Sequence, residues 1–194
     1  MYPPPSSPLT GLSRRRVLGL SLGLGAALLG GGWAVRASAR AAPRCLSFDA
    51  GQVATLEALI GAVVPTTPGF PSAADAAVLD RFDEETYFVS PEVRDDIRTA
   101  VDVLEYLPLL YGHLSRFSHL TVAERQRVLI AAAQSRFAVP RAVAGSLRMM
   151  AHLFYYGHRA TWRATGFDGP FARLEPKLSE QRVHFATLKK DAVG

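Results

Sequence analysis

The sequence predicts an all-α protein, an irregular bundle of about five helices that follows an N-terminal leader. Apolar residues recur every three or four positions almost throughout the chain from Asp49 onward. No stretch shows the strict alternation of apolar and polar residues that marks a half-buried strand. Several segments also begin with strong helix-capping signals. At 194 residues with 48% hydrophobic content, the chain can bury one sizeable core.

The chain divides into three parts: a leader over residues 1–41, a helical domain over 42–171, and an extended tail over 172–194 with a short helix expected from Ser179. Residues 1–12 are polar and rich in proline, which predicts disorder. Ser13-Arg14-Arg15-Arg16-Val17-Leu18 then fits the twin-arginine export pattern, with Arg14 and Arg15 as the targeting pair. An uncharged, glycine-rich run over 19–35 and a small-x-small cleavage candidate at 37–39 complete the signal.

An N-terminal membrane anchor is the alternative interpretation of the leader, because the run over 17–35 is about as long as a transmembrane helix. Its glycines and the Ala-Ser-Ala site favour an export signal, since an anchor needs neither. We therefore expect export by the twin-arginine translocase to the periplasm, or to the outer face of the cytoplasmic membrane if the signal is not cleaved.

The first two helices are predicted between Asp49 and the acidic residues near position 85. Asp49 and Gln52 form a capping box, and Pro65 ends that helix. Its expected buried face contains Val53, Leu56, Ile60 and Val63. Ser72 is the expected cap of a second helix, whose buried residues would be Ala76, Leu79 and Phe82.

Three further helices are predicted after position 90. Ser90-Pro91 starts one of them, and Pro108 should kink or end it. A capping box of Thr121 and Glu124 opens the next, and Pro140 begins the last. The helix after Ser90 is expected to bury Val93, Ile97, Val101 and Leu104. The helix after Thr121 is expected to bury Val128, Leu129 and Ala132, and the helix from Pro140 is expected to bury Leu147, Met150, Leu153 and Phe154.

The net charge of +5 does not indicate nucleic-acid binding. Five arginines lie in the leader over residues 1–41, and the body after it has 17 basic and 17 acidic residues. Without a basic excess in the body, the electrostatic footprint of a nucleic-acid-binding domain is missing. The single cysteine, Cys45, is either free or joined to another chain, because it has no partner for a disulfide within this one.

Catalytic and cofactor motifs are missing from the sequence. No Gly-x-Gly-x-x-Gly, phosphate-binding loop, haem-attachment motif or Glu-x-x-His pair occurs. His113 and His119, like His152 and His158, are six residues apart, which does not place either pair on one helical face. The adjacent acids at 84–85 and 95–96 are interpreted as solvated surface. We predict no catalytic, metal-binding or cofactor-binding residue in this chain.

The densest aromatic region lies between Met149 and Phe171. Periodicity favours the core for Met150 and Phe154. Other aromatic residues cover most of the helix circumference and continue into a Gly-Pro loop, so they are either core or a binding surface for another protein. The candidate interface residues are Tyr155, Tyr156, Trp162 and Phe167.

Four segments carry a resemblance to a known family: the twin-arginine leader, Leu56-Glu57-Ala58-Leu59-Ile60-Gly61-Ala62-Val63-Val64-Pro65, the stretch from Phe117 to Leu129, and Leu153-Phe154-Tyr155-Tyr156 leading to Thr161-Trp162-Arg163-Ala164-Thr165-Gly166-Phe167-Asp168-Gly169-Pro170. Over residues 49–171 the chain resembles gluconate 2-dehydrogenase subunit 3. It is also similar to the helical region that precedes the flavin domain of long-chain alcohol oxidases.

This resemblance implies a non-catalytic small subunit bound to a flavoprotein of the glucose-methanol-choline oxidoreductase class, which would hold the FAD. The leader would then export both proteins. The resemblance also implies a possible disulfide between subunits through Cys45, although this residue is expected near the mature N-terminus rather than in the helical core. The remaining alternatives are a membrane-tethered helical module without an enzyme partner and a small metal- or haem-binding redox protein.

Overall fold

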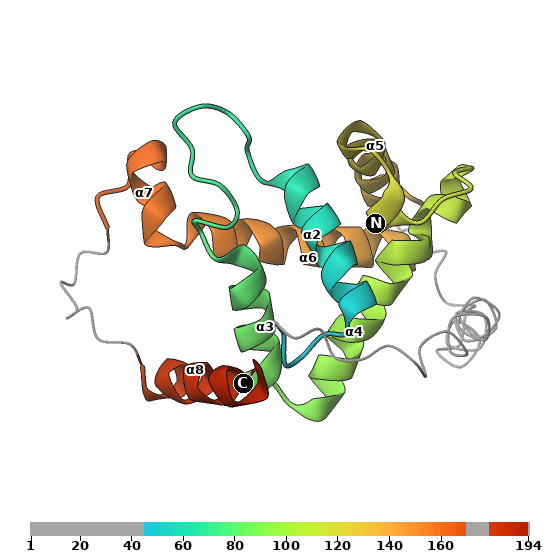
Figure 1. Ribbon diagram of the computed structural model, residues 1–194. Helices are drawn as coiled ribbons and strands as arrows, with labels where there is room; N and C mark the ends of the chain where they lie inside the picture. The colour runs from blue at the N-terminus through green and yellow to red at the C-terminus, as the bar shows by residue number, and fades with distance from the viewer. Residues whose placement is uncertain (1–44, 170–178, 194) are drawn as a thin grey trace, which may run out of the picture. The chain divides into compact units, whose positions relative to one another are not determined.

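Figure 1 shows the computed structural model, which describes residues 45–169 and 179–193. The regular structure of these residues is helical, which confirms the predicted all-α class. The predicted leader, with Arg14 and Arg15, lies outside the described residues, as do positions 172–178 of the tail. The helices of the described ranges are α2 Ala50–Val63, α3 Val78–Phe88, α4 Pro91–Tyr106, α5 Val122–Ala133, α6 Ala138–Tyr156, α7 Arg159–Thr165 and α8 Glu180–Val193, with short 3-10 helices η1 Leu107–Tyr111 and η2 Phe117–His119.

Three helices begin where their capping residues predict. The Asp49 carboxylate accepts a hydrogen bond from the backbone N–H group of Gln52 at 2.8 Å, as part of the capping box of α2. A second capping box, formed by Thr121 and Glu124, opens α5. In α4 the Ser90 hydroxyl caps the first turn, with Pro91 in the first helical position. Each cap satisfies backbone N–H groups that have no partner inside the helix.

Helix α2 is the centre of the domain. It contacts α3, α4, α5, α6 and η2, and in Figure 1 it crosses in front of α6. The prediction of a single buried face was too narrow, because Thr55, Ala58, Leu59 and Ala62 are buried along with the expected Leu56 and Ile60. The expected Val53 and Val63 are only partly buried against the core. A helix that is covered from several sides needs apolar or small residues around most of its circumference. The segment between Leu56 and Val64 meets that need.

Helix α4 ends before Pro108, as expected, and η1 continues the chain. Proline cannot donate the backbone hydrogen bond that an α-helix needs at that point. Val101 and Leu104 are buried, whereas Val93 in the first turn is exposed. Ile97 is partly buried against the core, so the predicted apolar stripe reaches the core from Ile97 onward.

The start of α3 differs from the prediction. Ser72 and Asp75 cap a single turn, in which the Ala76 amide donates to the Ser72 carbonyl at 3.1 Å. Ala77 then adopts a left-handed backbone conformation with φ 47° and ψ 38°, and α3 begins at Val78. The chain turns at Ala77 so that Val78 and Phe82 reach the core, where both are fully buried. Burial of these two side chains offsets the unfavourable backbone conformation at Ala77.

Replacing Ala77 by glycine is expected to stabilise the protein. A left-handed conformation costs a residue with a Cβ atom about 1–2 kcal/mol, and glycine adopts it freely. Part of this gain is lost because glycine makes the unfolded chain more flexible, so we expect a net increase of about 0.5–1 kcal/mol in the free energy of unfolding. Chemical denaturation measures it. The matched control is Ala100→Gly, in the regular helix α4, which should lower stability by roughly 1 kcal/mol. If both substitutions lower the free energy of unfolding, the backbone at Ala77 is not strained.

Helix α6 begins at Ala138, two residues before the predicted start at Pro140, and runs for 19 residues. Leu147 is buried as expected, and Met150 and Phe154 are partly buried against the core. Leu153 was assigned to the wrong side of the helix. Its side chain is 64% exposed, because Ala151 and Tyr155 take the buried positions on either side of it.

The tail forms a longer helix than predicted. The short helix expected from Ser179 is α8, which has 14 residues and lies beside α3 in Figure 1. Phe185 is buried and packs against Tyr87 and Phe88, with ring centroids 5.5 and 5.9 Å apart. Lys189 of α8 also pairs with Asp80 of α3 at 2.5 Å. A helix, rather than an extended tail, therefore covers one side of α3.

Candidate partner interface

The aromatic region predicted as an interface forms the corner between α6 and α7. Thr161 is fully buried in this corner, and its hydroxyl, which has one hydrogen, lies within hydrogen-bond distance of the carbonyl oxygens of His158 at 2.7 Å and Tyr155 at 3.1 Å. The same two carbonyl groups accept the backbone N–H groups of Thr161 and His158, so the hydroxyl adds a donor where α6 ends and α7 begins. The ring of His158 caps α7 by accepting the Ala160 amide at 3.2 Å. The corner is thus held by its own polar groups.

Tyr155 is a core residue rather than an interface residue. Its side chain is fully buried, and its hydroxyl donates to the Pro71 carbonyl at 2.7 Å. This contact joins α6 to the proline-rich loop between α2 and α3. Burial raises the pKa of the Tyr155 phenol, and the neighbouring Tyr156 adds to the effect. The interface prediction for Tyr155 was wrong because the aromatic residues were assigned to the surface as a group.

The other three predicted residues keep exposed or partly exposed rings. Tyr156 is 41% exposed and meets the Tyr155 ring edge to face. Trp162 is partly buried and packs edge to face on Phe167, with ring centroids 5.2 Å apart. Gly169 lies against the same indole, where an added Cβ would approach Trp162 to 3.1 Å. Phe167 is 49% exposed. Aromatic rings of this kind are common in protein interfaces.

The largest exposed apolar side chains of α6 were not predicted. Met149 is 66% exposed and lies on the same side of α6 as Leu153, Val139 and Tyr156, which are also exposed. A solvent-facing helix surface usually carries charged residues, and apolar surface at this density often marks a contact with another molecule. The sequence signal was present, since Met149, Leu153 and Tyr156 follow one another at intervals of four and three positions.

Charge is unevenly distributed in the formally neutral body. Residues 49–105 contain 12 acidic and 3 basic side chains, a net charge of −9. Residues 106–167 contain 8 arginines and 1 glutamate, a net charge of +7, and no acidic residue occurs from Arg125 to Phe167. The exposed apolar surface of α6 therefore lies in the basic half of the sequence, which favours acidic partners.

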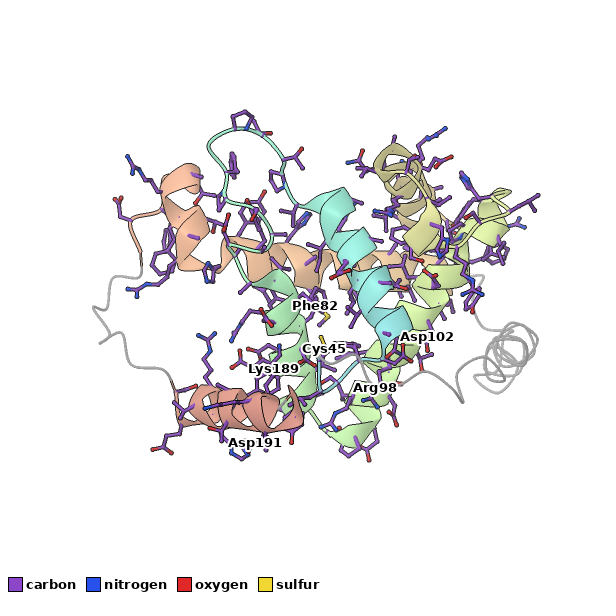
Figure 2. All side chains as sticks on the ribbon, viewed as in Figure 1. Cys45, Phe82, Arg98, Asp102, Lys189 and Asp191 are labelled. Carbon is purple, nitrogen blue, oxygen red and sulfur yellow. The ribbon has the colours of Figure 1, made fainter. Side chains whose placement is uncertain are left out.

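A buried carboxylate anchors the first described residues of the chain. Asp83 of α3 is fully buried and accepts the backbone N–H groups of Leu46 and Ser47 at 2.9 and 2.7 Å. Ser47 returns a hydrogen bond to the Asp83 carbonyl, and its own carbonyl accepts from Arg98 at 2.6 Å. Figure 2 shows Cys45, Arg98 and Lys189 around this segment. The segment 45–48 is thereby fixed to α3 and α4.

Cys45 lies in the hydrophobic core, which corrects the expectation that it lies outside it. Its side chain is 4% exposed. Burial, together with the nearby carboxylate of Asp83, raises the pKa of the Cys45 thiol from 9.0 to about 12. A thiol that is both buried and protonated is a poor nucleophile and cannot reach a second chain. The structure thus disfavours the disulfide between subunits.

Cys45 is expected to react slowly in the folded protein. A rise of three pKa units lowers the thiolate fraction at pH 8 by about a thousandfold, and burial restricts access as well. Labelling by a chromogenic disulfide reagent should be at least about a hundredfold slower in buffer than in denaturant. Rapid labelling of the native chain would contradict this placement. The pKa of the Cys45 thiol is higher in the folded protein than in the unfolded one. The free energy of unfolding should therefore fall as pH rises from 9.0 to about 12.

Two of the histidines and one of the paired acids make structural contacts. The ring of His152 lies 3.3 Å from the Val63 carbonyl, and His158 caps α7. Within residues 45–169 and 179–193, no group of three or more metal-ligating side chains comes together. Asp95 is exposed as predicted, but Glu84 is mostly buried and pairs with Arg81 at 2.7 Å and with Arg182 of α8 at 3.4 Å. Glu84 therefore helps to hold α8.

Comparisons of the chain with protein-family models, with curated proteins and with solved structures gave no match. The relation to gluconate 2-dehydrogenase subunit 3 therefore stays a prediction from the motifs. In the described part of the chain, no helix combines the length and apolarity that a membrane span requires.

Proposed function

We propose that this chain is a non-catalytic helical subunit of an FAD-dependent oxidoreductase of the glucose-methanol-choline class, with an alcohol, sugar or sterol as substrate. It stabilises the flavoprotein in the cytoplasm and escorts it through the twin-arginine translocase, with Arg14 and Arg15 as the targeting pair. The complex is delivered to the periplasm or to the outer face of the cytoplasmic membrane. FAD belongs to the partner subunit, and this chain holds no cofactor of its own.

The observation that carries the proposal is the exposed apolar surface of α6. The domain has a well-packed core in which Leu56, Leu59, Phe82 and Tyr155 are fully buried, so the exposed Met149 and Leu153 are not the result of a poorly formed fold. Covering such a surface with another protein removes apolar area from water, at about 25 cal/mol per Å². The twin-arginine pattern supports the escort role, because this pathway carries proteins that have already folded, often around a cofactor.

The alternative function is a membrane-tethered helical module without an enzyme partner. It would keep the leader as an uncleaved anchor and would be stable and monodisperse when purified alone. The exposed apolar surface of α6 favours the subunit over this alternative, because a tether at the N-terminus does not require a second apolar surface at α6.

The escort role can be tested in cells that produce this chain together with a candidate partner, a flavoprotein of the glucose-methanol-choline class that lacks an export signal. With Arg14→Lys and Arg15→Lys combined, we expect the periplasmic amounts of both proteins to fall by roughly tenfold or more, because the translocase receptor reads the arginine pair. Fractionation and immunoblotting of both subunits measure the effect. Arg36→Lys, outside the pair, is the matched control and should leave export unchanged. If the flavoprotein reaches the periplasm at its normal level, the escort role is wrong.

A further inference from the structure

One face of α6 has the spacing of a helix-pairing seam. Exposed residues recur along it at intervals of three and four positions, and none of them is charged: Val139, Ala142, Ser146, Met149, Leu153 and Tyr156. This is the alternation by which one helix presents a continuous stripe to a second helix. The buried face of α6, with Leu147 and Ala151, points to the opposite side and contacts α2, α4 and α5. The two faces serve different partners, one inside the domain and one outside it.

The residues of this seam suit close contact with a helix. Ala142 and Ser146 are small and lie in the middle of the seam, where they allow a neighbouring backbone to approach. Met149 and Leu153 provide the large apolar side chains of the next turns. Methionine adapts to irregular surfaces because its side chain is unbranched and flexible. The combination favours an α-helix over a loop or a flat sheet as the occupant.

Arginines form one flank of the seam. Arg141 directly precedes Ala142, and Arg148 directly precedes Met149, so the two guanidinium groups lie seven residues apart on the same side. Both are exposed, and α6 contains no acidic residue. In paired helices the positions that flank the seam choose the partner through their charges. The occupant should therefore carry acidic residues where it meets this flank.

Charge also distinguishes the possible occupants. The leader of this chain contains an apolar run, but Arg14, Arg15 and Arg16 precede it and Arg36 and Arg40 follow it, so that pairing would place like charges together. A second copy bound through its own α6 would likewise bring arginine flanks together. Like charges across an interface disfavour association. Neither segment of this chain fits the seam as well as an acidic helix does.

We propose that the α6 seam binds an amphipathic α-helix of another protein, whose apolar stripe is flanked by aspartate or glutamate on the side that meets Arg141 and Arg148. This inference rests on the proposed function in one respect, namely that the chain works as a bound subunit, and it adds which surface binds and which chemistry the partner presents. The exposed rings of Tyr156 and Phe167 extend the apolar contact toward α7.

A pair of synthetic peptides tests the seam without the flavoprotein. Both are amphipathic helices of three heptads with the same leucine and alanine stripe, and their flanking positions are all glutamate in one and all lysine in the other. Fluorescence anisotropy against the purified full-length chain at low salt should show at least about tenfold tighter binding of the glutamate peptide. Combining Arg141→Glu with Arg148→Glu should remove this preference, and Met149→Glu should prevent binding of either peptide.

Control substitutions place the binding on α6. Lys190→Glu and Val183→Glu, both on exposed positions of α8, should leave the affinity for the glutamate peptide unchanged. Thermal unfolding of each variant shows that the fold is intact. Equal affinity for both peptides, absence of binding to either, or binding that survives Met149→Glu would overturn the proposal.

A photoreactive residue in place of Met149 distinguishes the alternative occupants in cells. The proposal is supported if the residue captures a segment of another protein that has acidic flanks, and if this capture is lost when the charges of Arg141 and Arg148 are reversed. Capture of residues 17–35, of a second copy, or of lipid overturns it. The peptide result does not depend on the escort role, since the seam can bind an acidic helix even if the candidate flavoprotein is exported without this chain. Conversely, if export of the flavoprotein depends on this chain but neither peptide binds, only the seam is rejected.

Discussion

Asp83→Asn is expected to lower the free energy of unfolding by about 3 kcal/mol, because it removes a buried charged acceptor of several hydrogen bonds. The carboxylate accepts the N–H groups of Leu46 and Ser47, and Lys189 lies 3.8 Å from it. Both N–H groups lie within hydrogen-bond distance of Oδ1, at 2.9 and 2.7 Å, so an asparagine could still accept them with its single oxygen. Its NH₂ group would then lie at the Oδ2 position, where it would face the Leu46 N–H group, another donor, and would no longer attract Lys189.

The loss should be visible as a fall of roughly 6–12 °C in the melting temperature, for a domain of this size. Thermal unfolding followed by circular dichroism measures it. Asp95→Asn is the matched control, because Asp95 is 74% exposed and its pairing with Arg98, at 3.6 Å, is long. Exposed pairs of this kind contribute about 0–1 kcal/mol. Equal effects at the two positions would show that Asp83 does not anchor the segment 45–48.

Release of that segment should also expose Cys45. In Asp83→Asn the thiol should react faster with the chromogenic disulfide reagent than in the unchanged protein, even at temperatures far below the melting point. This second measurement separates local release from a general loss of stability, because local opening exposes only nearby groups. If Asp83→Asn is less stable but its Cys45 reacts at an unchanged rate, Asp83 stabilises α3 and does not hold the segment 45–48 in place.

Tyr155→Ala is the second substitution with a large expected effect, a loss of about 4 kcal/mol in the free energy of unfolding. The ring fills a fully buried site, and its hydroxyl is the donor to the Pro71 carbonyl. Removing the side chain creates a cavity and leaves that carbonyl without its donor. Tyr155→Phe keeps the ring and should cost only about 1 kcal/mol, the value of one hydrogen bond. Denaturant unfolding measures both variants.

Tyr156→Ala is the control for Tyr155 and separates folding from binding. The ring of Tyr156 is largely exposed, so its loss should change stability by less than about 1 kcal/mol. In contrast, it should weaken binding of the glutamate peptide, since Tyr156 forms the last position of the α6 seam. If Tyr156→Ala destabilises the domain as strongly as Tyr155→Ala, the assignment of the two rings to core and surface is wrong.

Local signals in the sequence predicted most of the helix boundaries. The capping boxes at Asp49 and Thr121, the Ser90-Pro91 start and the break at Pro108 all depend on residues within one turn of each other. Such interactions are the same in almost any fold, because they satisfy the free N–H groups at helix ends. The exception is Ser72, where burial of Val78 and Phe82 overrides the local cap.

The candidate interface was predicted only in part. The aromatic region between α6 and α7 was found, but Tyr155 was placed on the surface and Met149 and Leu153 were not recognised as exposed. The exposed stripe of α6 is apolar, as its buried face is, so apolar spacing alone does not tell which of the two faces lies in the core. Which face is buried depends on the positions of α2, α4 and α5, which the sequence of α6 does not contain.

The sequence by itself determined the all-α class, the starts of α2, α4 and α5, the missing basic excess in the body and the missing catalytic and cofactor motifs. Only the tertiary structure decided that Cys45 and Tyr155 are core residues, that Asp83 anchors the segment 45–48, and that α8 packs on α3. The reason is physical: caps and net charge are properties of neighbouring residues, whereas burial of a side chain results from elements that lie far apart in the chain. Cys45 and Lys189 are 144 positions apart in the sequence, yet both lie near the carboxylate of Asp83.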